Sequence, residues 1–192
     1  PKAAIGNNDS DWRRFKSSLF SKLEDVEPTM DLQFPVLQNL SELLRKSEHK
    51  LTAVTYKDEI LGIEEKDTTK TLVGMAFDIG TTSIVGYLMD LSTGEELKVV
   101  STLNPQTKYG ADVISRINYT NIEENGLEML HSTIIGAINK LIAEAAEKAD
   151  ISIDDIYLIS IVGNTTMHHL FLGLRPKYIA LYPYIPTISE PV

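Results

Sequence analysis

Two stretches near the start of the chain have apolar residues at spacings of three and four, the pattern of an amphipathic helix. The first predicts a helix from Asp9 to about Leu23, capped by Asp9 or Ser10, with a stripe formed by Trp12, Phe15, Leu19 and Leu23. The second predicts a helix over residues 35–44. Residues 51–56 and 59–63 are rich in β-branched side chains and predict a hairpin. We therefore expect a small α+β domain over residues 1–70, bounded by the polar stretch 64–70.

The pattern changes after this boundary, where short apolar runs alternate with tight turns. We expect three antiparallel strands, a short helix, a long helix, a strand covered on both faces and a final helix, at residues 71–78, 83–90, 97–103, 112–117, 127–148, 156–162 and from Asn164 onward. The order β-β-β-α-β-α predicts a mixed sheet with helices packed on it. The fold class is therefore α/β, with a second domain over residues 71–192.

Composition narrows the classes of function. The chain has 192 residues, 18 Lys and Arg against 27 Asp and Glu, and a net charge of −9. This balance disfavours nucleic acid and anionic membranes as partners, because both are bound through Lys and Arg. The absence of cysteine excludes disulfides, thiolate nucleophiles and Cys-ligated clusters within this sequence. No apolar run is long enough to span a membrane, so we expect a cytoplasmic protein. Because the chain opens on Pro1 without Met, we expect its ends to be cuts in a longer protein.

The sharpest chemical signal is the turn between the first two strands after residue 70. Asp78 ends a strand, and Gly80, Thr81, Thr82 and Ser83 lead directly into the next. Glycine lets a backbone approach a phosphate, successive N–H groups can hold the anion, and hydroxyls add donors. Asp78 could hold Mg²⁺ nearby, through water. The alternative is a hairpin turn whose Asp and Thr only satisfy the local backbone.

Other polar groups have competing structural explanations. Gly163, Asn164 and Thr165 form a strand-to-helix turn whose free N–H groups suit an anion, or simply a helix cap. The spacing of Asp112 and Arg116 predicts a salt bridge on one helical face. His168 and His169 point about 100° apart on a helix, so we expect them to be packed or solvated rather than metal ligands.

Three blocks of sequence together resemble the ATP-dependent reductive activators of corrinoid proteins. The blocks are residues 74–82; residues 104–106 with 109–113 and Arg116; and residues 162–170. In that family a ferredoxin-like domain with an iron–sulfur cluster precedes a linker, a middle domain and an actin-like (ribonuclease H-like) ATPase domain. By resemblance, residues 1–70 are a middle, linker-type domain. Residues 71–192 are then the first half of the ATPase domain, with the cluster and the second half lying outside this sequence.

The resemblance also implies a function. Asp78, Gly80, Thr81, Thr82 and Ser83 would bind ATP and Mg²⁺, with Asp78 as the metal residue, and Gly163, Asn164 and Thr165 would face the same cleft. Gln106, after Asn104 and Pro105, would orient a catalytic water; for these three residues turn chemistry is the alternative.

The intact protein would restore the Co(I) state of a corrinoid iron–sulfur protein or a corrinoid methyltransferase protein, and a homodimer is one arrangement to test. This segment alone would hydrolyse little ATP. Two alternatives stay open: a small-molecule kinase of the same superfamily, and a non-catalytic interaction or dimerisation module.

Overall fold

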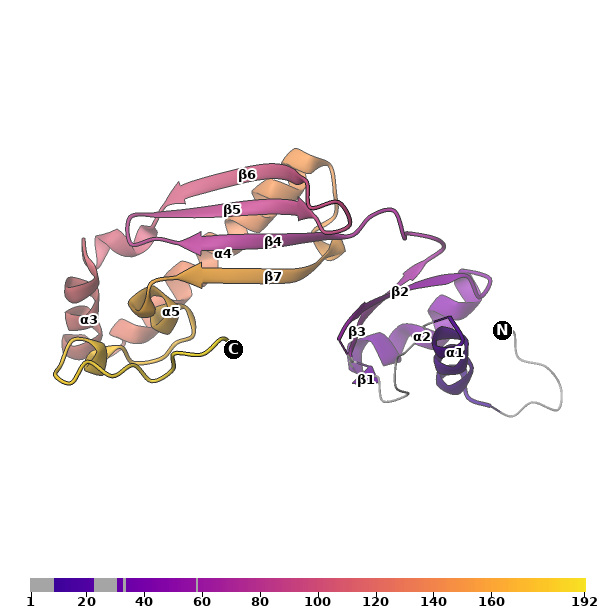
Figure 1. Ribbon diagram of the computed structural model, residues 1–192, viewed down its shortest axis with the longest axis horizontal. Coiled ribbons are helices and arrows are strands. Elements are labelled where there is room, and N and C mark those ends of the chain that lie inside the picture. Colours follow the sequence, from indigo (N-terminus) through magenta and orange to yellow (C-terminus); the bar gives the residue numbers. More distant parts are fainter. Residues whose placement is uncertain (1–8, 23–30, 33, 58) are drawn as a thin grey trace. The chain divides into compact units, whose positions relative to one another are not determined.

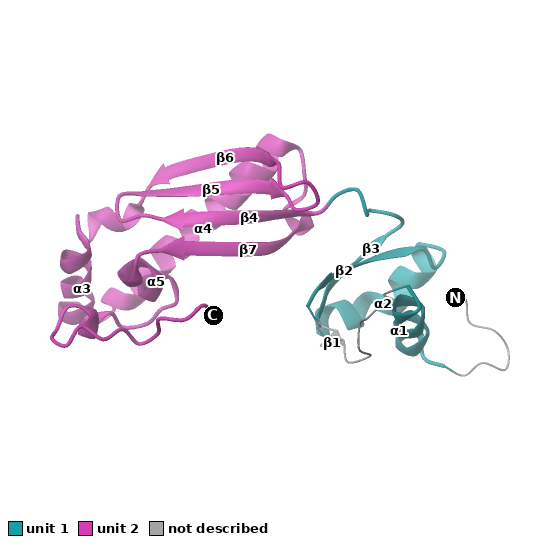
Figure 2. Ribbon diagram, in the orientation of Figure 1, with its two compact units in different colours: residues 1–71 teal, residues 72–192 magenta. Residues whose placement is uncertain are grey.

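The computed structural model describes residues 9–22, 31–32, 34–57 and 59–192. The chain divides into two compact units, Pro1–Thr71 and Leu72–Val192 (Figure 2). Each unit has its own buried core, and each is described separately below.

The first unit packs two helices against a small sheet. Helix α1 (Asp11–Phe20) begins after Ser10, whose hydroxyl accepts the amide of Arg13, as a helix cap requires. The remaining elements are β1 (Asp31–Leu32), α2 (Phe34–Lys46), β2 (Leu51–Tyr56) and β3 (Glu59–Glu65). Strands β2 and β3 form the predicted antiparallel hairpin, and the unpredicted β1 pairs in parallel with β3. Phe15, Leu40, Leu44 and Ile60 form the core, while Leu23 of the predicted stripe lies outside the described residues.

The second unit is built on a four-stranded mixed sheet (Figure 1). Its strands are β4 (Val73–Ile79), β5 (Ser83–Asp90), β6 (Glu96–Leu103) and β7 (Ile156–Gly163), arranged in the order β6-β5-β4-β7. The first three are antiparallel, as predicted, whereas β7 lies parallel to β4. A parallel neighbour requires a crossover, and helices supply it.

The long helix of that crossover covers one face of the sheet. Helices α3 (Val113–Ile122) and α4 (Gly126–Ala149) follow β6 and the short 3₁₀ turn η1 (Pro105–Lys108), and α5 (Thr165–Phe171) follows β7. Two further 3₁₀ turns, η2 (Ile153–Asp155) and η3 (Lys177–Ile179), complete the unit. The core joins alternate residues of β4 to the buried stripe of α4, listed as Val73, Met75, Phe77, Ile79, Leu130, Ile134, Ile138 and Leu141.

One strand is less covered than its sequence predicts. Strand β7 is an edge strand among the described elements, with Ile159 41% and Val162 61% exposed. The apolar run therefore predicted the strand correctly, but the prediction that both of its faces are covered was wrong. Such a run does not specify what packs on each face. None of the described helices combines the length and the hydropathy that a membrane-spanning segment needs.

Candidate functional site

The ends of three strands and the start of one helix meet at one end of the sheet in the second unit. Strands β4, β6 and β7 all end there, as their arrowheads in Figure 1 show, and β5 begins there. This topology brings the turn 80–82 close to Asn104 after β6 and to Asn164 after β7. Asn164 Nδ2 donates to Thr81 Oγ1 at 3.1 Å. The structure therefore joins two groups of predicted residues that lie more than eighty positions apart.

The carbonyl oxygens of the turn are held by the protein. Asn104 Nδ2 donates to the carbonyl of Gly80 at 2.8 Å, and the Asn104 amide donates to the carbonyl of Thr82 at 2.8 Å. Arg116 Nη2 donates to the carbonyl of Thr81 at 2.5 Å. Both Asn104 and Arg116 have no exposed surface. Three consecutive carbonyls are thus fixed by buried groups, which makes the turn a rigid feature.

This arrangement orients the amides of the same peptides. In a trans peptide the N–H points opposite to the C=O, so the amides of Thr81 and Thr82 point away from the buried Asn104 and Arg116. No hydrogen bond among the described residues is donated by either amide. Successive unengaged amides of this kind form a concave anion site. Gly80 is required here, because a Cβ at this position would lie 2.7 Å from the carbonyl oxygen of Ser83.

Asp78 and the hydroxyl residues lie on the accessible side of this turn. Asp78, Thr82 and Ser83 are exposed and Thr81 is half-buried. Asp78 alternates with the buried Phe77 and Ile79, so its side chain lies on the face of the sheet opposite the core. A single exposed carboxylate beside unengaged amides suits Mg²⁺, which keeps several waters and takes its other ligands from phosphates.

Arg116 does not form the salt bridge that the sequence predicts with Asp112. Asp112 instead caps α3: its carboxylate accepts the Ser115 amide at 2.8 Å, a hydrogen bond that lowers the pKa of Asp112. Arg116 Nε donates to the carbonyl of Gly110 at 2.9 Å, and no ion pair among the described residues includes Arg116. Burial lowers the pKa of Arg116 by desolvating the charged form, but a guanidinium remains charged at neutral pH. The turn is therefore backed by a buried positive charge without a carboxylate partner.

Gln106 is not placed to orient water. The residue has no exposed surface; its Nε2 donates to the carbonyl of Leu130 at 2.9 Å, and its Oε1 accepts Arg116 Nη1 at 3.3 Å. Its amide also donates to Asn104 Oδ1, which caps η1. The alternative of turn chemistry describes Asn104, Pro105 and Gln106 better. The structure therefore corrects the prediction that Gln106 orients a catalytic water. Gln106 supports Arg116 instead.

Comparison with known proteins identifies the family. Residues 1–70 match the RACo linker region, and residues 73–192 match the RACo middle region. The chain belongs to the RACo family. The RACo chain is 38% identical over 170 residues to the corrinoid activation enzyme RamQ of Eubacterium limosum, covering 87% of this chain and 29% of that protein. It also resembles the solved structure of a reductive activator for corrinoid, iron–sulfur protein. That match has a TM-score of 0.80 and 32% identity, and covers 97% of this chain and 30% of the other.

The RACo chain therefore spans less than a third of the length of these two relatives. The family resemblance stated from sequence is confirmed. In the family's terms the first unit is the linker region and the second unit is the middle region, so the word "middle" applies to the second segment.

The helix that follows β7 has mostly structural roles in this RACo chain. Asn164 Oδ1 accepts the amide of Met167 and caps α5, while its Nδ2 reaches Thr81. A Cβ on Gly163 would lie 2.9 Å from the carbonyl oxygen of Ile79, which explains the glycine where β7 meets β4. Thr165 is exposed beside this cap. Asn164 thus both caps α5 and bonds to the turn 80–82.

Of the two adjacent histidines, one is packed and the other partly exposed, in line with the predicted packed or solvated pair. His169 has no exposed surface; Nδ1 bonds to the carbonyl of Thr165 at 2.8 Å, and Nε2 accepts the amide of Thr187 at 2.9 Å. His168 is half-buried, and the two rings meet edge to face. His169 therefore fixes the segment after α5, which sequence patterns did not indicate.

Proposed function

We propose that the turn between β4 and β5 binds the phosphates of Mg·ATP in an activator that returns a corrinoid protein to its Co(I) state. One observation carries the proposal: buried Asn104 and Arg116 hold the turn's carbonyls, which directs the amides of Thr81 and Thr82 away from the core. Asp78, on the accessible side, would hold Mg²⁺, and the hydroxyls of Thr81, Thr82 and Ser83 would add donors.

Electrostatics favour the same ligand. A buried charge without a counter-ion is unfavourable, and an anion close to it offsets that cost. The Arg116 guanidinium lies one peptide behind the proposed phosphate site, since it bonds to the carbonyl of Thr81. A phosphate on the opposite side of that peptide would thus receive both the amide dipole and the field of Arg116. Arg116 is a positioning residue in this proposal, because it acts through the turn.

The name of each relative supports the choice of partner. RamQ is a corrinoid activation enzyme, and the solved relative is a reductive activator for corrinoid, iron–sulfur protein. We propose for this chain that residues 72–192 form one wall of an actin-like nucleotide cleft. The other wall, and an iron–sulfur domain that supplies the electron, would belong to parts of the relatives that the match does not cover. ATP would bias closure of the cleft, and the closed form would favour one-electron reduction of Co(II) in the partner.

Asp78→Asn in the complete protein tests the proposal. Because Asp78 is exposed and outside the core, the substitution should leave the free energy of unfolding unchanged while weakening Mg·ATP binding at least tenfold in calorimetry. Asp154→Asn is the matched control, since Asp154 is also exposed but lies in η2, before β7 begins, at the other end of that strand. Equal Mg·ATP affinity in wild type and Asp78→Asn would contradict the phosphate site.

A further inference from the structure

The first unit contains a groove that the proposed nucleotide site does not use. It lies between α1, β2 and the residues that follow β3, and has a volume of about 840 Å³. Apolar side chains line it, including Phe15, Leu44 and Leu51. Three lysines also line it: Lys22, Lys50 and Lys66, all of them exposed. The groove thus combines an apolar lining with a positively charged rim.

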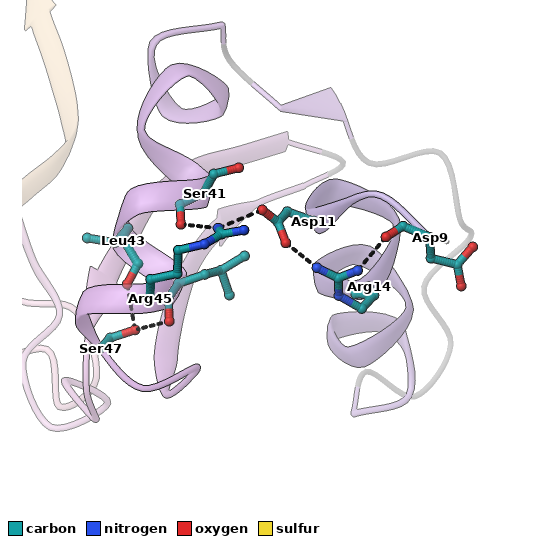
Figure 3. Close-up of polar contacts among 8 residues, drawn as sticks. Asp9, Asp11, Arg14, Ser41, Leu43, Arg45 and Ser47 are labelled. Atoms are coloured by element: carbon teal, nitrogen blue, oxygen red, sulfur yellow. Dashed lines mark hydrogen bonds and ion pairs between the residues drawn. The ribbon is translucent and has the colours of Figure 1, made fainter. Parts of the chain in front are cut away.

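These lysines differ from the other cations of the unit. Figure 3 shows Asp11 between Arg14 and Arg45, and both arginines pair with its carboxylate. Arg13 pairs with Asp9 and Lys46 with Glu65. In contrast, the described residues form no ion pair with any of the three groove lysines.

Aromatic rings account for two more cations of this unit. Lys16 lies over the rings of Trp12 and Phe20, and Lys57 over the ring of Tyr56. None of the three groove lysines has such a contact within the described ranges. Among the described cations of this unit, those without such a partner therefore gather around the groove, with Lys70 as the exception.

The groove lining sets one carboxylate against these three lysines. It belongs to Asp67, the only carboxylate among the described residues of the lining, and its Oδ1 accepts both the amide and the hydroxyl of Thr69, so the lining keeps an excess of positive charge. His49, also in the lining, has a buried Nδ1 without a hydrogen-bond partner among the described residues. A buried polar atom without a partner costs about 1–3 kcal/mol, so a ligand that turned this ring toward itself could relieve that cost.

We propose that this groove docks an acidic segment of the corrinoid protein, with carboxylates against Lys22, Lys50 and Lys66 and apolar side chains against the lining. The identity of the partner rests on the proposed function; the chemistry of the segment rests on the groove. Charge complementarity selects an anionic ligand, and the apolar lining selects one with apolar side chains. Nucleic acid fits this groove poorly, because a phosphate backbone has no apolar side chains to cover the lining.

The test compares two triple variants of the complete protein. Lys22→Glu/Lys50→Glu/Lys66→Glu should weaken binding of the purified corrinoid protein at least tenfold in calorimetry and reduce the dependence of affinity on salt. Lys16→Glu/Lys57→Glu/Lys70→Glu carries the same change of charge in the same unit but outside the groove lining, and should bind within about threefold of wild type. Replacing the three groove lysines by Arg should retain binding.

Each outcome decides a specific point. If wild type binds and the groove variant binds equally well, the groove proposal is overturned and the proposed function stands. If wild type does not bind the corrinoid protein, the proposed partner fails as well. Light scattering covers one more case: a wild-type dimer that the groove variant converts to monomer would assign the groove to a second copy of this chain. In NMR, a shift of the His49 ring signal on adding the corrinoid protein is expected, and an unchanged signal counts against the site.

Discussion

Arg14 in the first unit and Arg116 in the second are both buried, but their charges are balanced in different ways. Arg14 is 9% exposed and pairs with the carboxylate of Asp11, which also binds Arg45. Arg116 is fully buried and bonds to the carbonyls of Thr81 and Gly110 and to the amide oxygen of Gln106. Arg14 therefore has a carboxylate partner within its own unit, whereas no described carboxylate pairs with Arg116. The second unit keeps a net positive charge behind an accessible turn, which is the arrangement expected of an anion site.

Removing each guanidinium is the strongest way to separate the two cases. Arg116→Met should lower the free energy of unfolding of the second unit by about 3 kcal/mol, because three buried oxygens lose their donor. Arg14→Met should cost the first unit less, about 1–2 kcal/mol, because Arg45 still pairs with Asp11 and its carboxylate is not left unpaired. Hydrogen exchange of α4 amides reports on the second unit. Fluorescence of Trp12, the single tryptophan, reports on the first. A larger loss for Arg14→Met would reverse the comparison.

The shape of the turn can be changed without touching Arg116. Gly80→Ala should destabilise the second unit by about 2 kcal/mol and weaken Mg·ATP binding, because the new Cβ would lie 2.7 Å from the Ser83 carbonyl oxygen. Gly136→Ala is the control: it is exposed in α4 with no atom within 4 Å of its Cβ, so it should stabilise the helix by about 0.5–1 kcal/mol. Unfolding in urea measures both. A Gly80→Ala protein with wild-type stability and affinity would show that the turn needs no close approach.

Lowering the pH should have the smallest effect on stability, and in the first unit the ion pair of Asp11 should account for part of it. The hydrogen bond from Arg45 is the main cause that lowers the pKa of Asp11 below its usual 3.8. The stability this ion pair contributes is therefore complete above pH 3.8 and is lost as the pH falls through the lower pKa of the folded state.

Urea unfolding followed by Trp12 fluorescence at pH 6 and at lower pH should show a loss of up to about 1 kcal/mol in wild type. Asp11→Asn should lack that part of the loss. Arg116 should contribute no such pH dependence, because it stays protonated throughout. Identical acid responses of wild type and Asp11→Asn would show that the pair does not stabilise the first unit.

Periodicity predicted the helices and strands of both units to within a few residues at most ends. The stripe of α4 and the run of β5 are long and regular, so local pattern was sufficient. Strand β1 has only two residues and no period to detect, and its pairing with β3 depends on contacts distant in sequence. The exposure of β7 was also missed, because an apolar run is the same whether or not both faces are covered.

The candidate site was also predicted correctly in one part and incorrectly in another. The run from Asp78 to Ser83 indicated a phosphate turn from its residue types alone, because glycine and hydroxyl residues in a strand-to-strand turn suit that chemistry. The roles of Arg116 and Gln106, which lie behind the turn, were predicted incorrectly. Spacing on one helix predicted that Arg116 would pair with Asp112, and the family resemblance implied that Gln106 would orient a catalytic water.

The amino-acid sequence determined the local chemistry of this RACo chain: which segments are helical or extended, where a glycine turn lies and which residues could donate to an anion. Those properties depend on neighbours along the chain. Only the tertiary structure decided which groups surround each charged side chain. Arg116 reaches from α3 to a carbonyl 35 residues away. The three lysines of the groove lie just after α1, just before β2 and just after β3, and folding brings these positions together. Burial and charge balance depend on what surrounds a side chain in space, which no local spacing specifies.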